Sequence, residues 1–120
     1  MGDVSKHFSR SEFACNCGLC PQRAVDSELL TLLEGLREYF LQEVTITSGW
    51  RCEAHNKAVG GLPASKHLEG IAADIIVNGT PPDKVHYYLD KTYPDEMGLG
   101  KYSKFTHIDV RDHKARWSSP

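Results

Sequence analysis

Hydrophobic residues recur along the chain with helical spacing in two places. Over residues 26–40 the apolar positions are Leu29, Leu33, Leu36 and Phe40, while Glu34 and Glu38 fall off that stripe. This spacing predicts an amphipathic helix with Asp26 as its N-cap, because a carboxylate there accepts the unpaired N–H groups of the first turn. A second stripe, Val85, Tyr88 and Leu89, predicts a helix that begins with Thr80 as N-cap and Pro81 as its first residue.

Four short segments are predicted as strands: residues 44–47, 72–77, 98–102 and 106–110. We expect the last two to pair antiparallel through a turn near Ser103. A short helix is expected over residues 53–59, with loops over residues 1–25 and 60–70. The resulting order is helix, strand, short helix, strand, helix, strand, strand, which favours an α+β fold with a small antiparallel sheet flanked by helices.

Size and charge narrow the possible functions. The 120 residues fit one domain over residues 1–120, and 14 basic against 16 acidic residues give a net charge of −2. This balance argues against a nucleic-acid binder, which needs a basic surface. Apolar runs such as Ile75-Ile76-Val77 are too short to span a membrane, and the first ten residues contain no apolar signal segment. We therefore expect a chain made in the cytoplasm without a visible signal peptide.

Six histidines and four cysteines are the metal-capable residues of the chain. His67 and Asp74 are seven positions apart, at the end of a glycine-rich segment and on a predicted strand. His107, Asp109 and Arg111 alternate along the last predicted strand and would share one face of the sheet. Such groups are costly to bury unless they bind a ligand or pair with one another. The residues alone leave both a metal site and a simple ionic network open.

Three segments of the chain together resemble a known enzyme family. They are Ser48-Gly49-Trp50-Arg51, the string Ser65-x-His67-x-x-Gly70-x-Ala72-x-Asp74, and His107-x-Asp109. The chain is similar in these segments to the zinc D-Ala-D-Ala carboxypeptidases, which include phage and bacterial cell-wall endopeptidases and share a fold group with lysostaphin-type enzymes and the hedgehog domain. The resemblance implies an endolysin-like zinc peptidase that cleaves peptidoglycan stem peptides, as a D,D-carboxypeptidase or endopeptidase. The sequence shows no strong dimer face, so we expect a monomer. It would act at the bacterial cell wall or in the periplasm once released.

The resemblance also assigns roles to individual residues. It implies that His67, Asp74 and His107 bind one catalytic Zn²⁺ ion. Ser65 would offer its hydroxyl to a substrate carboxylate or to a ligand. Arg51 would bind a substrate carboxylate or stabilise the oxyanion. The alternative for Arg51 is a structural salt bridge to a carboxylate such as Asp74 or Asp109.

The general base is not assigned by the resemblance, because Lys104 and Phe105 occupy the positions where relatives carry it. Asp109 is our candidate replacement, since it is expected on the same strand face as His107. Its alternative role is to fix the tautomer of a ligand histidine. His113 is a reserve candidate. Without any base, the chain would be a catalytically silent zinc fold that binds cell-wall peptide or a protein partner.

The cysteines allow several interpretations. Cys15, Cys17 and Cys20 lie close together near the N-terminus, and Cys52 follows Arg51. The four residues fit a structural zinc site, two disulfides, a redox pair at positions 17 and 20, or buried reduced thiols. We expect at least one link between the N-terminal segment and Cys52.

Overall fold

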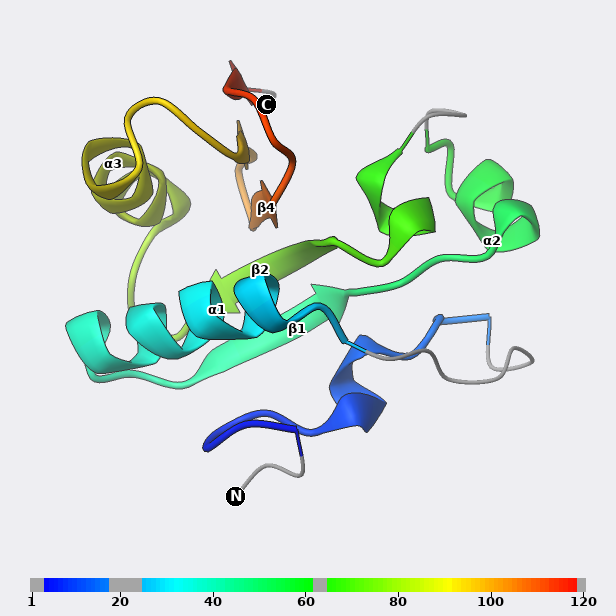
Figure 1. Cartoon of the computed structure of the whole chain (residues 1–120), viewed down its shortest axis with the longest axis horizontal. Coiled ribbons are helices and arrows are strands. Elements are labelled where there is room, and N and C mark those ends of the chain that lie inside the picture. The colour runs from blue at the N-terminus through cyan, green and yellow to red at the C-terminus, as the bar shows by residue number, and fades with distance from the viewer. Residues whose placement is uncertain (1–3, 18–24, 62–64, 119–120) are drawn as a thin grey trace.

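A mixed five-stranded sheet carries the described part of the chain, in the strand order β1-β2-β4-β3-β5 (Figure 1). The computed structural model describes residues 4–17, 25–61 and 65–118. Its elements are η1 (Arg10–Phe13), α1 (Ser27–Phe40), β1 (Val44–Ser48), α2 (Glu53–Ala58), η2 (Lys66–Glu69), β2 (Ala72–Val77), α3 (Pro82–Thr92), β3 (Gly98–Lys101), β4 (Thr106–Asp109) and β5 (Ala115–Ser118). The α+β class predicted from the sequence is confirmed.

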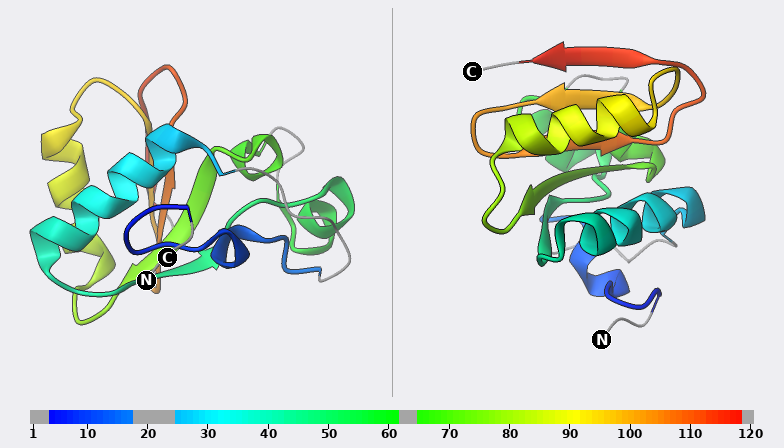
Figure 2. Two further views of the ribbon diagram at one scale, coloured as in Figure 1. Left: turned by 60° about the horizontal axis from the view of Figure 1, so that its bottom comes forward. Right: turned by 90° about the vertical axis from the view of Figure 1, so that its left-hand side faces the viewer.

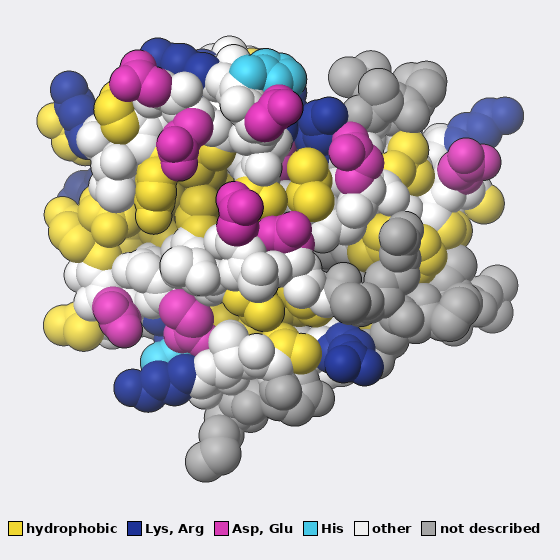
Figure 3. Space-filling model, in the orientation of Figure 1, with side chains coloured by type: hydrophobic (Ala, Val, Ile, Leu, Met, Phe, Trp, Pro, Cys, Tyr) yellow, Lys and Arg dark blue, Asp and Glu magenta, His cyan; other side chains and the backbone are white. Residues whose placement is uncertain are grey.

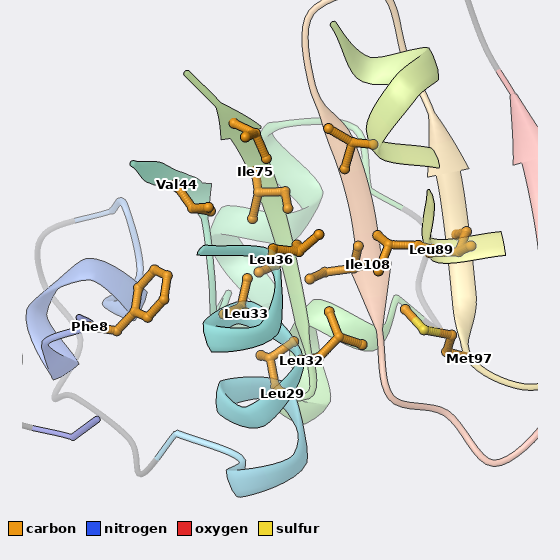
Figure 4. Packing of buried hydrophobic residues seen from close by; sticks show 14 of the residues in the cluster. Phe8, Leu29, Leu32, Leu33, Leu36, Val44, Ile75, Leu89, Met97 and Ile108 are labelled. Atoms are coloured by element: carbon orange, nitrogen blue, oxygen red, sulfur yellow. The ribbon is translucent and has the colours of Figure 1, made fainter. Parts of the chain in front are cut away.

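Helices α1 and α3 cover the same face of the sheet (Figure 2). Helix α1 begins as predicted, since the Asp26 side chain accepts a hydrogen bond of 3.0 Å from the backbone N–H of Leu29. Its apolar stripe packs on the sheet together with side chains of α3 (Figure 4). The buried cluster includes Leu29, Leu32, Leu33, Leu36, Ile75, Val85, Leu89, Leu99 and Ile108. The helical spacing of these leucines therefore marks the side of α1 that is removed from water.

Helix α3 begins one residue later than the sequence predicted. Its N-cap is Pro81 rather than Thr80, and Pro82 is the first helical residue. A residue that precedes proline is disfavoured in helical backbone, so Pro81 stays extended, with φ −68° and ψ 152°. The proline pair therefore places the start of the helix at Pro82.

Two single turns of 3-10 helix lie in segments that were predicted as loops. One is η1, where Glu12 accepts the backbone N–H of Ser9 at 2.7 Å and closes a capping box. The other is η2, which ends at Gly70 in the left-handed conformation with φ 76°. Glycine adopts the left-handed backbone conformation with less steric strain than other residues, so Gly70 suits the sharp turn before β2.

Strand β5 was not predicted, and it makes the sheet mixed rather than wholly antiparallel. It pairs parallel with β3, whereas the pairs β1–β2, β2–β4 and β3–β4 are antiparallel. The Arg116 side chain holds it there, because its guanidinium donates to the carbonyl oxygens of Tyr93 and Met97 and to the Asp90 carboxylate. Strand β5 is held by contacts with distant residues and not by a local sequence pattern, so the sequence alone did not indicate it.

Among the described residues no helix has the length and apolar character needed to cross a membrane. On the face drawn in Figure 3, acidic and basic side chains are interspersed, which agrees with the net charge of −2.

The N-terminal segment is held against α1 by one carboxylate. Glu34 accepts hydrogen bonds from the Ser5 hydroxyl at 2.6 Å and from the His7 backbone N–H at 2.7 Å, and it also contacts the His7 ring. Burial raises the pKa of the Glu34 carboxyl, but these hydrogen bonds outweigh burial and hold the pKa below its ordinary value of 4.5. The ionised form therefore stabilises the fold.

We predict that Glu34→Gln lowers the free energy of unfolding at pH 7 by about 1–2 kcal/mol, because hydrogen bonds to a charged acceptor are lost. A lowered pKa in the folded state stabilises the protein above pH 4.5 and ceases to do so as the pH falls below that value. The difference in the free energy of unfolding between wild type and Glu34→Gln should therefore become smaller at acidic pH. Urea unfolding at several pH values measures this. Glu38→Gln, on the exposed side of the same helix, is the control; equal effects of both substitutions would contradict the prediction.

Candidate metal centre

One row of residues crosses the sheet on the face opposite α1 and α3. The register pairs Ser48 with Asp74, Asp74 with His107, His107 with Gly100, and Gly100 with Trp117. Directly opposed residues in neighbouring strands point to the same side of a sheet. The row therefore brings an aspartate, a histidine and a tryptophan together from three different strands.

His67 reaches this row from η2. Its Nδ1 lies 2.7 Å from the carbonyl oxygen of Gly49, which only accepts hydrogen bonds, so Nδ1 carries the proton. Its Nε2 then faces Asp74 Oδ1 at 3.2 Å. The backbone N–H of His67 donates to Ser65 Oγ, and its carbonyl oxygen accepts from the N–H of Arg51. Backbone contacts on both sides thus fix the ring orientation.

His107 lies between two carboxylates. Its Nε2 lies 2.9 Å from Asp109 Oδ2, and its Nδ1 lies 3.0 Å from Asp74 Oδ1. Burial lowers the pKa of His107, but the hydrogen bonds to Asp109 and Asp74 outweigh burial and raise it, so without a bound cation the ring favours a proton on each nitrogen. A metal ion on the Asp74 side would replace the proton on Nδ1, while Asp109 keeps the proton on Nε2.

Three acceptor atoms therefore converge when both imidazoles are neutral. The ligand atoms of His67, Asp74 and His107 all lie within 4.8 Å of one another, and all three residues are buried. Facing lone pairs repel unless a proton or a metal ion lies between them. Two imidazole nitrogens and one carboxylate form a donor set suited to zinc, so the residues fit the metal that the sequence implied.

The charge state of Asp74 suits cation binding. Burial raises the pKa of its carboxyl, but hydrogen bonds and charge from His107 and His67 outweigh burial and lower the pKa to about 2. Arg51 adds an ion pair, since its Nη2 lies 3.3 Å from Asp74 Oδ2. Asp74 is consequently ionised at neutral pH.

Asp109 lies behind His107, away from Asp74. Its carboxylate is fully buried and receives a bidentate pair from Arg111, with Nε and Nη2 each at 2.7 Å, together with the backbone N–H of Gly98. Burial raises the pKa of Asp109, but the bonds from His107 and Arg111 outweigh it and hold the pKa well below its usual range. Both oxygens are occupied, which favours the tautomer-fixing role over that of a general base.

Small neighbours create the space for this buried carboxylate. Asp109 is paired across the sheet with Ala72 on one side and Gly98 on the other, and Gly98 is paired with Ala115. A Cβ atom at Gly98 would overlap the Asp109 carboxylate. Arg111 lies beyond the end of β4, so it reaches Asp109 from a turn and not from the strand face that the sequence predicted.

The row and η2 form the floor of an open cleft of about 660 Å³. Arg51, Ser65, His67, Asp74 and His107 all line it. Tyr102, Phe105 and Trp117 form an aromatic wall of the cleft. Of these three, only Phe105 was singled out from the sequence. A Cβ atom at Gly100 would overlap the Trp117 ring. The glycine at position 100, within a predicted strand, was therefore the feature of the sequence that could have indicated a large side chain lying across β3.

Two residues considered from the sequence lie away from this floor. The Lys104 side chain is exposed, and His113 is exposed and contacts Asp112. Neither lines the cleft.

The match to known proteins can now be set beside this geometry. The family model described as Peptidase M15 matches residues 6–109. The chain belongs to the peptidase M15 family. The resemblance noted in the sequence is thereby confirmed, and M15 peptidases are metallopeptidases, in agreement with a His67–Asp74–His107 group able to bind a metal. No curated protein and no solved structure matches the chain.

Cysteines form a second cluster in this M15 chain. Cys15, Cys17 and Cys52 come together, and none of the three is in a disulfide. Cys20 lies outside the described residues. Burial raises the pKa of the Cys15 thiol, which argues against its being an activated redox thiol.

We predict that Asp109→Asn lowers zinc affinity by about 10–100-fold, because the uncharged amide no longer holds the His107 tautomer. Competition with a chromophoric chelator measures the affinity. Asp112→Asn, an exposed acid three residues away, is the control and should bind zinc as wild type does. Unchanged zinc affinity together with abolished peptide hydrolysis would instead identify Asp109 as the base.

Proposed function

We propose that the chain is a zinc peptidase that cleaves peptidoglycan stem peptides, as a D,D-carboxypeptidase or an endopeptidase. The observation that carries the proposal is the convergence of His67 Nε2, His107 Nδ1 and Asp74 on the floor of an open cleft within an M15 domain. Its substrate would be the peptide of the bacterial cell wall, so the enzyme would act there or in the periplasm.

His67, Asp74 and His107 would hold the zinc ion. Zinc in such a site polarises a peptide carbonyl and lowers the pKa of water. Asp109 and the Gly49 carbonyl act through the ring nitrogens that face away from the metal position. They keep protons on His107 Nε2 and His67 Nδ1 and so leave the other nitrogens free to bind. We therefore propose Asp109 as a positioning residue.

Arg51 and Ser65 would recognise the substrate. The Arg51 guanidinium lines the cleft while Ser48 Oγ, Asn56 Oδ1 and Asp74 Oδ2 hold it at 3.1–3.3 Å. A guanidinium fixed in this way presents a planar donor edge to a carboxylate at low entropic cost. Stem peptides that end in D-Ala supply such a carboxylate. The aromatic wall of the cleft would pack against the rest of the peptide.

A catalytically silent, peptide-binding zinc fold is the second candidate. Among the described residues that line the cleft, Asp74 is the sole carboxylate, and Phe105 occupies a position where relatives carry a base. Peptide hydrolysis needs a group that takes a proton from water and passes it to the leaving amine. The lack of a second carboxylate among these residues is the observation that favours a binding module over an enzyme.

Digestion of purified muropeptides by zinc-loaded protein tests the proposal. We expect release of D-Ala or cleavage of cross-links by wild type, with both lost in His67→Ala because a metal ligand is removed. His113→Ala is the control, since that histidine is exposed and outside the cleft. Products are identified by mass spectrometry.

The outcomes separate the two candidates. Wild type that binds one zinc ion in the cleft and binds stem peptide without cutting it would support the silent fold. Cleavage that persists in His67→Ala would contradict the metal assignment.

We further predict that Arg51→Lys raises KM for peptides with a free C-terminal carboxylate more than for the same peptides with a C-terminal amide, because lysine cannot form a bidentate pair. Steady-state kinetics on the two peptide series measure the ratio. A purely structural Arg51–Asp74 salt bridge would weaken activity toward both series equally. Lys57→Arg, on the exposed surface of α2, is a control for the substitution itself.

A further inference from the structure

Three sulfur atoms converge where the N-terminal segment meets the connection between β1 and α2. Cys15 Sγ lies 3.8 Å from Cys52 Sγ, and Cys52 Sγ lies 4.0 Å from Cys17 Sγ. All three sulfurs lie within 4.8 Å of one another. The cluster is distinct from the His67–Asp74–His107 group, with which it shares no residue.

The spacing of the sulfurs fits metal ligands. Two thiolates bound to one tetrahedral zinc ion at about 2.3 Å are about 3.8 Å apart. Two sulfurs in a disulfide are only about 2.05 Å apart. A disulfide would also use only two of the three sulfurs, whereas all three lie within 4.8 Å of one another.

Backbone donors surround the cluster. The N–H of Cys52 lies 3.4 Å from Cys15 Sγ, and the N–H of His55 lies 3.4 Å from Cys52 Sγ. Hydrogen bonds from N–H groups favour the negatively charged form of an acceptor. At Cys15 they offset only part of the effect of burial, so the thiol keeps its proton until a metal ion displaces it.

We propose that Cys15, Cys17 and Cys52 bind a second zinc ion. Each thiol loses its proton to solvent on binding, and the soft thiolate ligands select zinc over magnesium or calcium. No oxidant is needed, because the sulfurs form bonds to the metal and not to each other. The assignment of this site does not rest on the proposed peptidase activity.

This second ion would brace the first metal centre. Cys52 is next to Arg51, and the same connection carries Gly49, whose carbonyl orients His67. The N-terminal segment already packs there, since the N–H of Trp50 donates to the Phe13 carbonyl at 3.0 Å. A Cβ atom at Gly49 would lie 2.7 Å from Phe13 Cα, so the two backbones are in direct contact. The cysteine site would lock this contact.

Metal content of full-length protein purified under reductant tests the assignment. We expect about two zinc ions per chain in wild type, and about one in each of Cys15→Ser and His67→Ala, because structural and catalytic sites bind zinc independently. Asn16→Ser, an exposed position between two of the cysteines, is the matched control and should keep the wild-type content.

Cobalt loading of His67→Ala provides a second measurement in which every cysteine is present, so it does not depend on the folding of a cysteine variant. We expect sulfur-to-cobalt charge-transfer bands in the near ultraviolet, with an intensity corresponding to at least three thiolates. Metal-free His67→Ala, or bound cobalt without these bands, would overturn the proposal. So would a disulfide between any two of the three cysteines in non-reducing peptide maps of the protein as isolated.

Discussion

The site depends on two imidazole nitrogens that must face the same carboxylate oxygen. His67 Nε2 and His107 Nδ1 both approach Asp74 Oδ1, at 3.2 and 3.0 Å. In the neutral rings each of these nitrogens is left without a proton, because the Gly49 carbonyl and Asp109 hold the proton on the other nitrogen of the ring. Such an arrangement of acceptors is stable only around a cation or added protons. Much of the surrounding structure serves to maintain it.

The sheet maintains this arrangement of ligand atoms through the register of its strands and through glycines that leave room for neighbouring side chains. Asp74 faces His107 because β2 and β4 pair in one register, and a slip of either strand by one residue would put the two side chains on opposite faces of the sheet. On the side of β4 away from β2, strand β3 has a glycine opposite His107 and another opposite Asp109. Gly98 leaves room for the Asp109 carboxylate, and Gly100 leaves room for the Trp117 ring. The buried ion pair of Asp109 and Arg111 thus fits inside a sheet without displacing the strands.

The N-terminal segment contributes to the same centre from outside the sheet. It is held by Glu34 of α1 at one end and contacts Gly49 and Trp50 at the other. The Gly49 carbonyl is therefore positioned by a segment far from the metal ligands in sequence. This connection explains how a short chain keeps a loop-borne histidine in a defined orientation.

The sequence by itself determined the elements with strong local signals and the chemical types of the ligands. Asp26 and the leucine stripe defined α1, and the string Ser65-x-His67-x-x-Gly70-x-Ala72-x-Asp74 together with His107-x-Asp109 identified the family. Tertiary structure decided which nitrogen of each histidine faces Asp74 and placed Asp109 behind His107. It also placed β5 beside β3 and brought Cys52 to Cys15 and Cys17. Capping and periodicity act within one or two turns of chain, so they are visible in sequence. Tautomers, register and sulfur clusters depend on contacts between residues dozens of positions apart, which only the folded chain brings together.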